Sequence, residues 1–209
     1  MKGNRIITIG RQIGSGGSEI GMEVAKRLGI QCYDRQLIEM ACDYGQLDQD
    51  ILAEAEEKRP NPFLSSVPRQ MQNDKTGRGI AINDMVFNLQ SEVIRRLAEK
   101  ESCVIIGRCA DYVLREQPGV TSVFIYADMN IRIACLMERR RITRDEAITL
   151  IKKTDKSRRN YYECYTGKRW GAGASYDVTL NSAELGLDTC VDLICSLYER
   201  KQEGDAQAR

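Results

Sequence analysis

A glycine-rich turn near the N-terminus has residue types and spacing that could hold a phosphate group. It follows a β-branched apolar run over residues 6–9, and its glycines and closing hydroxyl are Gly10, Gly14, Gly16, Gly17 and Ser18. From Ile20 onward, apolar residues recur every four positions, which is a helical period. Glycines let backbone N–H groups approach a ligand, and a helix N-terminus carries partial positive charge. This order of strand, turn and helix predicts an anion site, most often for phosphate; an ordinary glycine-rich turn is the alternative.

The turn departs from the P-loop pattern G-x-x-x-x-G-K-[ST] at two positions. With Ser18 at the hydroxyl position, Gly17 stands where the lysine is expected and Arg11 where the first glycine is expected. A P-loop lysine brings positive charge to the β- and γ-phosphates, so another cation has to take that role. Arg11 is the nearest candidate in the sequence.

The composition excludes several kinds of catalysis. The chain has 209 residues, a formal net charge of +1, eight cysteines and no histidine. Without histidine, Ser-His and Cys-His nucleophile systems and the commonest zinc ligand are excluded. The near-neutral charge gives no overall bias toward nucleic acid, and no apolar run approaches the ~18 residues of a membrane span. Several cysteines lie in apolar runs and there is no C-x-x-C pair, so we expect free thiols in a cytoplasmic protein.

Strand-like and helix-like segments alternate along the chain. The sequence predicts strands at residues 6–9, 30–33, 103–106, 122–126 and 176–181. It predicts helices at residues 18–28, 35–58, 80–97, 129–141, 143–165 and 187–200. The alternation indicates an α/β fold with a mostly parallel sheet and helices on both faces.

Other local signals mark the ends and connections of these segments. Thr143 and Glu146 match a capping box at the start of a helix. Residues 59–79 are rich in proline and glycine and are expected to form a mobile loop or insert. We expect one domain over residues 1–200 and a disordered polar tail over 201–209.

Polar residues stand at the carboxyl ends of three predicted strands. They are the turn at residues 10–18, Asp34 with Arg35, and Gly107-Arg108 with Asp111. Ligands of parallel sheets bind at this edge, so we expect these stretches to meet there. A surface salt bridge is the alternative explanation for Arg108, since ion pairs are common at strand ends.

A basic segment lies between residues 138 and 169. Eleven basic and five acidic side chains give it a net charge of +6. A solvated helix face would explain such a run. The alternative is a cationic cover for phosphates, because arginine stays charged and binds phosphate oxygens in a fork. RNA-binding motifs are not seen, so we do not expect nucleic acid as a partner.

Five motifs, in order along the chain, resemble those of the cytidylate kinase-like family, within the P-loop nucleoside-monophosphate kinases. The resemblance runs from residue 5 to about residue 198, and its motifs are residues 9–20, 33–35, 106–112, 155–162 and 165–170. It implies a three-layer P-loop kinase fold whose five-stranded parallel sheet has the order 2-3-1-4-5. It also implies a monophosphate-binding insert at about 35–79 and a lid at about 139–170.

The resemblance also implies roles for individual residues. ATP phosphates would be held by Gly14, Ser15, Gly16, Gly17 and Ser18, with Ser18 also binding Mg²⁺. The acceptor would be held by Asp34, Arg35, Arg108 and Asp111. The resemblance places Arg139, Asp155 and Arg158 among the catalytic residues, and we add Arg11, the nearest cation that could replace the missing lysine. Cys109 stands where cytidylate kinases carry an acidic residue, which leaves the selectivity for the base open.

The expected function is ATP-dependent phosphorylation of a nucleoside monophosphate, with CMP or dCMP as first candidates and with ATP and Mg²⁺ as cofactors. Two alternatives stay open: a nucleotide-binding module that transfers nothing, and a kinase of another small acceptor. The expected partners are small-molecule nucleotides, with no membrane. The sequence leaves the oligomeric state open.

Overall fold

Five parallel strands form the sheet at the centre of the computed structural model, which describes residues 4–34, 37, 40 and 82–207. Within this part of the chain the strand order is β2-β3-β1-β4-β5, which confirms the expected topology. The strands are β1 (Ile6–Arg11), β2 (Gln31–Tyr33), β3 (Cys103–Ile106), β4 (Val120–Tyr126) and β5 (Val178–Asn181). The expected helix at 35–58 and the loop at 59–79 lie outside the described residues, apart from Leu37 and Met40.

β1 is the central strand and contributes to both faces of the sheet. It pairs with β3 on one side and with β4 on the other, so that Ile9 lies level with Ile106 and Val123. Successive side chains of a strand point to opposite faces. Ile9 therefore packs into one apolar cluster while Ile6 packs into another, and both are fully buried. The β-branched run of β1 reflects this burial on two faces.

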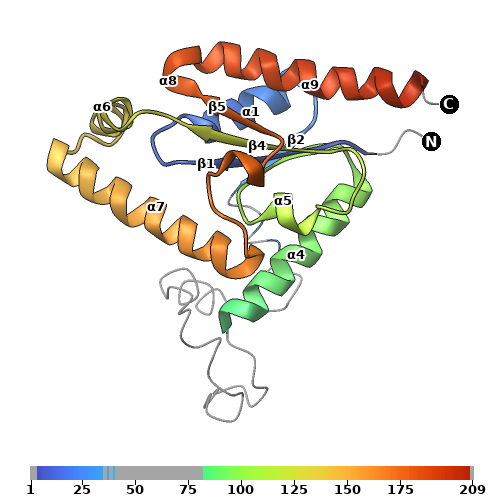
Figure 1. The fold of residues 1–209 in the computed structure, drawn as a ribbon, viewed down its shortest axis with the longest axis horizontal. Helices are drawn as coiled ribbons and strands as arrows, with labels where there is room; N and C mark the ends of the chain where they lie inside the picture. The colour runs from blue at the N-terminus through green and yellow to red at the C-terminus, as the bar shows by residue number, and fades with distance from the viewer. Residues whose placement is uncertain (1–3, 35–36, 38–39, 41–81, 208–209) are drawn as a thin grey trace, which may run out of the picture.

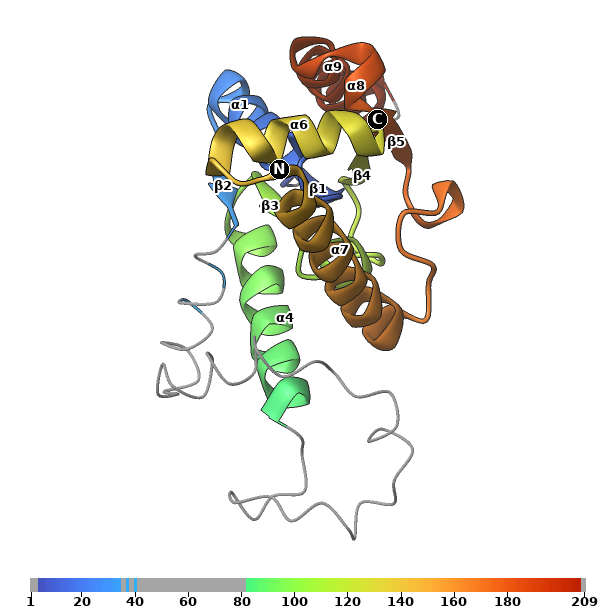
Figure 2. The same ribbon diagram turned by 90° about the vertical axis from the view of Figure 1, so that its left-hand side faces the viewer.

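Helices cover both faces of the sheet and make a three-layer structure (Figures 1 and 2). One layer holds α1 (Gly17–Leu28), α8 (Ser182–Leu185) and α9 (Leu187–Gln207), and the other holds α4 (Ile82–Lys100) and α5 (Ala110–Val113). The apolar residues of α1 that recur every four positions, Ile20 and Val24, are buried against the sheet as the helical period predicts. Gly29 ends α1 in a left-handed conformation with φ of 65°.

Two further helices extend from the carboxyl edge of the sheet. α6 (Met129–Arg140) leads into α7 (Arg144–Thr166), and the predicted capping box of Thr143 and Glu146 is confirmed. The far end of α7 lies next to α4 (Figure 1), and the rings of Phe87 and Tyr165 stack there with centroids 4.1 Å apart. α7 therefore connects the edge of the sheet to the helical layer below it.

The last helix is longer than the sequence indicates. We expected the last helix to end at Arg200 and a disordered tail to begin at Lys201, but α9 continues to Gln207. Lys201, Gln202 and Glu203 have high helix propensity and favour continuation beyond Arg200, whereas Gly204 and Asp205 do not. The seven cysteines of the described part are free, as expected. None of the helices described here combines the length and apolar character that crossing a membrane requires.

Candidate active site

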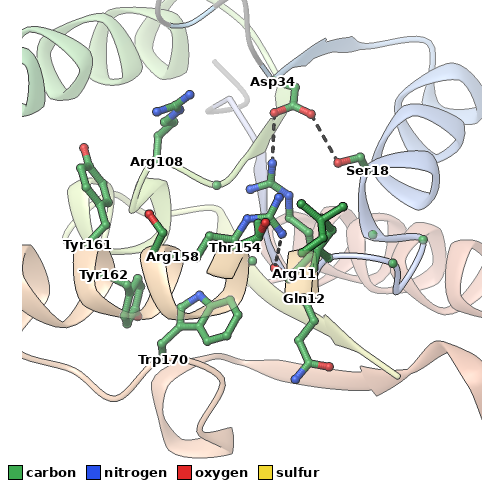
Figure 3. A pocket seen from close by; sticks show the side chains of 18 of the residues that line it. Arg11, Gln12, Ser18, Asp34, Arg108, Thr154, Arg158, Tyr161, Tyr162 and Trp170 are labelled. Carbon is green, nitrogen blue, oxygen red and sulfur yellow. Dashed lines mark hydrogen bonds and ion pairs between the residues drawn. The ribbon is translucent and has the colours of Figure 1, made fainter. Parts of the chain in front are cut away.

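A pocket of about 1050 Å³ lies at the carboxyl ends of the central strands (Figure 3). Its walls come from the turn between β1 and α1, from the ends of β2 and β3, and from α4, α6 and α7. The described residues of the three polar stretches expected at strand ends therefore meet in one cavity, with Asp34 representing the second stretch. The physical reason is that the carboxyl ends of parallel strands share one edge of the sheet.

The glycine-rich turn forms the floor of this pocket next to the start of α1. Gly14 and Gly16 have φ values of 77° and 75°, which favour glycine, and Gly16 is the N-terminal cap of α1. A Cβ on Gly14 would lie 2.9 Å from the backbone oxygen of Arg132, so a side chain would also be blocked there. Backbone N–H groups in the first turn of a helix have no partner within the helix, which leaves this end suited to an anion.

Two serine hydroxyls hold the turn in place from behind. Ser15 is buried, and its hydroxyl donates to the backbone oxygens of Gln12 at 2.9 Å and Ile125 at 3.2 Å. Ser182 donates to the backbone oxygen of Ser15 at 2.6 Å. The hydroxyl of Ser15 therefore stabilises the loop, and Ser15 is absent from the described residues that line the pocket.

Asp34 connects two groups that are expected to face phosphate, a guanidinium and a hydroxyl. Arg11 donates from Nη2 to Oδ1 of Asp34 at 3.2 Å, and Ser18 donates from its hydroxyl to Oδ2 at 3.4 Å (Figure 3). The side chain of Arg11 is 16% exposed and that of Asp34 is 36% exposed, so the guanidinium is the better shielded partner of this ion pair. The pair holds the guanidinium of Arg11 beside the start of α1.

The same three residues include oxygen ligands of the kind that Mg²⁺ prefers. Mg²⁺ is commonly bound by one or two protein oxygens together with phosphates and water. The hydroxyl of Ser18 and the carboxylate of Asp34 lie within 3.4 Å of each other and both line the pocket. These residues fit a magnesium ion that shares its coordination with nucleotide phosphates.

Asp155 lies beneath the turn and joins it to α6 and α7. Its Oδ1 accepts a hydrogen bond from the backbone N–H of Ile13 at 3.0 Å, and its Oδ2 accepts one from Nη1 of Arg132 at 2.5 Å. Asp155 and Arg132 are both buried, at 8% and 5% exposure. Both carboxylate oxygens therefore have protein partners, and Asp155 is not among the described residues that line the pocket.

Arg158 approaches the turn from α7, one helical turn beyond Asp155. Its Nη1 donates to the backbone oxygen of Arg11 at 2.9 Å. Burial lowers the pKa of the Arg158 guanidinium from its ordinary value of 12.5, but an arginine remains charged at neutral pH. Arg158 therefore contributes a positive charge at the point where β1 enters the turn.

The basic segment turns only part of its charge toward the pocket. The basic side chains of α6 and α7 that line it are Arg139, Arg140, Lys153 and Arg158. Arg139 also forms an ion pair with Glu19 in the first turn of α1, which links the end of α6 to the glycine-rich turn. The other basic residues of the segment do not line the pocket, in agreement with a solvated face for part of the run.

The far end of the pocket begins where β3 ends. Gly107, Arg108 and Cys109 have φ values of 77°, 56° and 55°, so three successive residues are left-handed. Such a conformation costs on the order of 1–3 kcal/mol at a residue other than glycine, and it is concentrated at functional sites. It directs Arg108 into the pocket beside Asp34 and Arg158 (Figure 3).

Asp111 and its partner form the polar wall of this end. The hydroxyl of Tyr162 donates to Oδ2 of Asp111 at 2.7 Å. Burial raises the pKa of Asp111 above its ordinary value of 3.8, while the hydrogen bond from Tyr162 opposes the rise. Burial also raises the pKa of Tyr162, so its hydroxyl stays protonated and remains a donor. Tyr161 and Gln90, joined by a hydrogen bond of 3.3 Å, line the pocket nearby.

The structure therefore brings most of the predicted site residues to one cavity. The predicted residues that line it are Arg11, Gly14, Gly16, Gly17, Ser18, Asp34, Arg108, Asp111, Arg139 and Arg158. Arg35 lies outside the described residues. Sequence analysis assigned no role to Arg132, Gln90, Tyr161 and Tyr162. Positions 151, 155, 158 and 162 recur every three or four residues, and this helical period could have placed Tyr162 on the same face as Arg158.

Comparison with known proteins identifies a family and a fold. A model of the cytidylate kinase-like family matches residues 6–184. No curated protein matches the chain. The crystal structure of an uncharacterized protein from Eubacterium ventriosum has 27% sequence identity and a TM-score of 0.69, over 94% of this chain and 99% of that chain.

Two similar structures of lower identity are those of small-molecule kinases. A shikimate kinase from Bacteroides thetaiotaomicron has 14% identity and a TM-score of 0.53, over 93% of this chain and 98% of that chain. A gluconokinase from Sinorhizobium meliloti has 13% identity and a TM-score of 0.53, over 100% of this chain and 99% of that chain. At such identities the likeness shows the α/β P-loop kinase fold alone.

Proposed function

The chain belongs to the cytidylate kinase-like family, and we propose that it transfers the terminal phosphoryl group of ATP to a small acceptor. A nucleoside monophosphate of the CMP or dCMP type is the first candidate. The donor site is the glycine-rich turn, and the acceptor site is the far end of the same pocket.

The observation that carries this proposal is the convergence of cations from separate elements on the glycine turn. Arg11 of β1, Arg108 after β3, Arg139 of α6 and Arg158 of α7 all line one pocket together with the turn. Phosphoryl transfer spreads negative charge over the equatorial oxygens of the transferred group, and positioned cations stabilise that charge. A ring of arginines around a helix N-terminus is suited to this chemistry.

At the donor end, the N–H groups of residues 14–18 would bind the ATP phosphates. Arg11 and the lid arginines Arg139 and Arg158 would supply the positive charge that Gly17 cannot. Ser18, with Asp34 beside it, would hold Mg²⁺, which when bound neutralises charge on the β- and γ-phosphates. Asp155 would support this site indirectly, because it fixes the backbone of Ile13 and the buried Arg132.

At the acceptor end, Arg108 would bind an anionic group of the acceptor. Asp34 and Asp111 would accept hydrogen bonds from its polar groups, and we keep Arg35 as a further predicted contact. In the transfer, the acceptor oxygen forms a bond to the γ-phosphorus as the bond from that phosphorus to the bridging oxygen of ADP breaks. The described pocket lining has no histidine or free thiolate positioned as a nucleophile, so a direct transfer is the simplest course.

A specific observation favours a second candidate, in which the acceptor is a small molecule other than CMP. Cys109 follows Arg108 where cytidylate kinases carry an acidic residue, and it is buried. Burial raises the pKa of its thiol, so Cys109 offers no negative charge to a base. The base-selecting contacts of a cytidylate kinase are therefore incomplete at this position.

An acceptor screen tests both candidates. ADP release is measured with Mg²⁺-ATP and each common nucleoside monophosphate, followed by hydroxy acids and sugar acids. We expect CMP or dCMP to raise the rate at least tenfold over ATP alone, and selective stimulation by another acceptor would support the second candidate. Calorimetry shows whether Mg²⁺-ATP binds. Binding without turnover for every acceptor would indicate a nucleotide-binding module, and the absence of binding would refute the proposal.

A further inference from the structure

A side chain at position 17 would overlap with the side chain of Arg11, although six positions separate the two residues in the sequence. A Cβ built on Gly17 would lie 2.5 Å from Cβ and 3.1 Å from Cγ of Arg11. Real Cβ atoms essentially never come within 3.0 Å of another heavy atom in this way. A side chain at position 17 therefore collides with the stem of Arg11, close to the backbone.

Rotation of the side chains cannot relieve this collision. A Cβ position is set by the backbone, so two Cβ atoms at 2.5 Å can separate only if a strand or helix moves. Arg11 is paired with Ile125 in the central sheet, and Gly17 is buried at the first position of α1. Since both elements are fixed in the core, at least one of the two positions has to be glycine.

The remainder of the Arg11 side chain follows a path that a second glycine keeps open. A Cβ on Gly107 would lie 2.2 Å from Nη1 of Arg11. Beyond this point the guanidinium reaches Oδ1 of Asp34. The stem of Arg11 thus passes Gly17 and its head passes Gly107. Asp34 holds the end of the side chain (Figure 3).

We propose that only one of positions 11 and 17 can carry a side chain. We further propose that the phosphate-binding cation, which the P-loop pattern places on the helix at position 17, is supplied in this chain by the strand at position 11. The formal P-loop pattern has glycine at the first of these positions and lysine at the second. This chain has Arg11 and Gly17, which is the reverse arrangement. Gly17 and Gly107 are then positioning residues for Arg11. The assignment of the cation to phosphate rests on the proposed function, whereas the steric exclusion does not.

The proposal predicts that restoring the lysine alone is harmful and that restoring it together with the glycine is tolerated. The experiment compares the wild-type chain with Gly17→Lys, Arg11→Gly and the double variant Arg11→Gly/Gly17→Lys, which carries the complete G-x-x-x-x-G-K-S pattern. Binding of Mg²⁺-ATP is measured by calorimetry and the melting temperature by scanning calorimetry. We expect each single variant to bind at least tenfold more weakly, since hydrogen bonds to charged groups have about this effect. We expect the double variant to return to within about threefold of wild type.

A matched pair of alanine variants separates steric exclusion from charge. Gly17→Ala adds the Cβ without a charge, and we expect it to lower the melting temperature by roughly 5 °C in the wild-type background. In the Arg11→Gly background the same change should have little effect, because the remaining contact, with Cβ of Ile125 at 3.2 Å, needs a shift of only a few tenths of an ångström. The double variant Arg11→Gly/Gly17→Ala should fold but bind Mg²⁺-ATP as weakly as Arg11→Gly.

The possible negative results contradict different parts of the proposal. Wild-type stability and nucleotide binding in Gly17→Ala would overturn the exclusion. A double variant with lysine that binds no better than Arg11→Gly would overturn the transposition of the cation. If Gly17→Lys does not fold, a soluble Arg11→Gly/Gly17→Lys supports the exclusion and an insoluble one overturns it. If the wild-type chain binds no Mg²⁺-ATP, the proposed function fails, while the melting temperatures of the alanine pair still decide the exclusion.

Discussion

Arg158 donates a hydrogen bond from its guanidinium to the backbone oxygen of Arg11, over 2.9 Å. The contact joins α7 to the end of the central strand, at the point where the chain enters the glycine-rich turn. One side chain thus links the predicted lid to the predicted donor site. Because an arginine has five N–H donors, the remaining donors of Arg158 can serve a ligand while this bond is kept.

Replacement of Arg158 tests the cationic role of α7. We expect Arg158→Ala to lower kcat/KM at least 100-fold, because removal of a group that stabilises the transition state typically costs 10²–10³ in rate. Arg158→Lys should recover little of this, because lysine cannot reproduce the fork of a guanidinium. Steady-state kinetics with the best acceptor from the screen provides the measurement. Lys156→Ala, an exposed neighbour on the same helix, is the control and should stay within about twofold of wild type.

Asp155 is predicted to matter for stability, whatever it contributes to the reaction. Asp155→Ala would leave the buried guanidinium of Arg132 without its carboxylate and the N–H of Ile13 without an acceptor. Breaking a buried ion pair from one side costs about 3–5 kcal/mol, which we expect to see as a lower denaturation midpoint in urea. The double variant Asp155→Ala/Arg132→Met should be more stable than Asp155→Ala, since no buried charge remains.

The exposed ion pair of Glu92 and Arg96 provides the comparison for that experiment. It joins two residues on the surface of α4 at 2.9 Å. Exposed pairs contribute about 0–1 kcal/mol, so Glu92→Ala should have a small effect. Equal losses for Asp155→Ala and Glu92→Ala would contradict the supporting role inferred for Asp155.

Asp111 should make stability depend on pH in a definite direction. Its folded-state pKa is raised above 3.8, so the folded chain binds more protons than the unfolded chain between these two pKa values. Stability therefore falls as the pH rises from the unfolded-state pKa of Asp111 to its raised folded-state pKa. Above the folded-state pKa the carboxylate is charged and the full cost of burying that charge is present. We expect Asp111→Asn, measured by thermal melts from pH 4 to pH 8, to become more stable relative to wild type as the pH rises. A constant or shrinking difference would show that the carboxylate is not held at a cost.

Ser18 is predicted to act through magnesium, and Ser15 through the fold. Ser18→Ala should reduce the gain in ATP affinity that Mg²⁺ provides, whereas Ser18→Thr, which keeps a hydroxyl, should preserve it. Ser15→Ala removes the hydroxyl whose single hydrogen is shared between the backbone oxygens of Gln12 and Ile125, and should lower stability by about 1–2 kcal/mol. Calorimetric titrations with ATP, with and without Mg²⁺, separate the two residues. Loss of the magnesium effect in Ser15→Ala alone would reverse these assignments.

The five strands, the helices α1, α4, α6, α7 and α9, and the edge of the sheet that holds the pocket could all be predicted from the sequence. Several of the signals are local patterns: the β-branched run of β1, the period of α1, the capping box of α7 and Gly29 at the end of α1. They depend on the backbone geometry of a few neighbouring residues, so they can be recognised without knowledge of the rest of the chain. The rule for parallel sheets then placed the strand-end residues at one edge.

Which side chains face the pocket and which support it from below depends on long-range packing, and it could not be predicted from the sequence. Asp155 and Ile13, which share a hydrogen bond, are 142 positions apart. Neither this bond nor the burial of Arg132 produces a pattern among neighbouring residues of the sequence. The exclusion between Arg11 and Gly17 is likewise a matter of distance between a strand and a helix that the turn brings together. Sequence spacing shows that these residues are present, but the packing of α1 and α7 against the sheet sets the distances between their atoms.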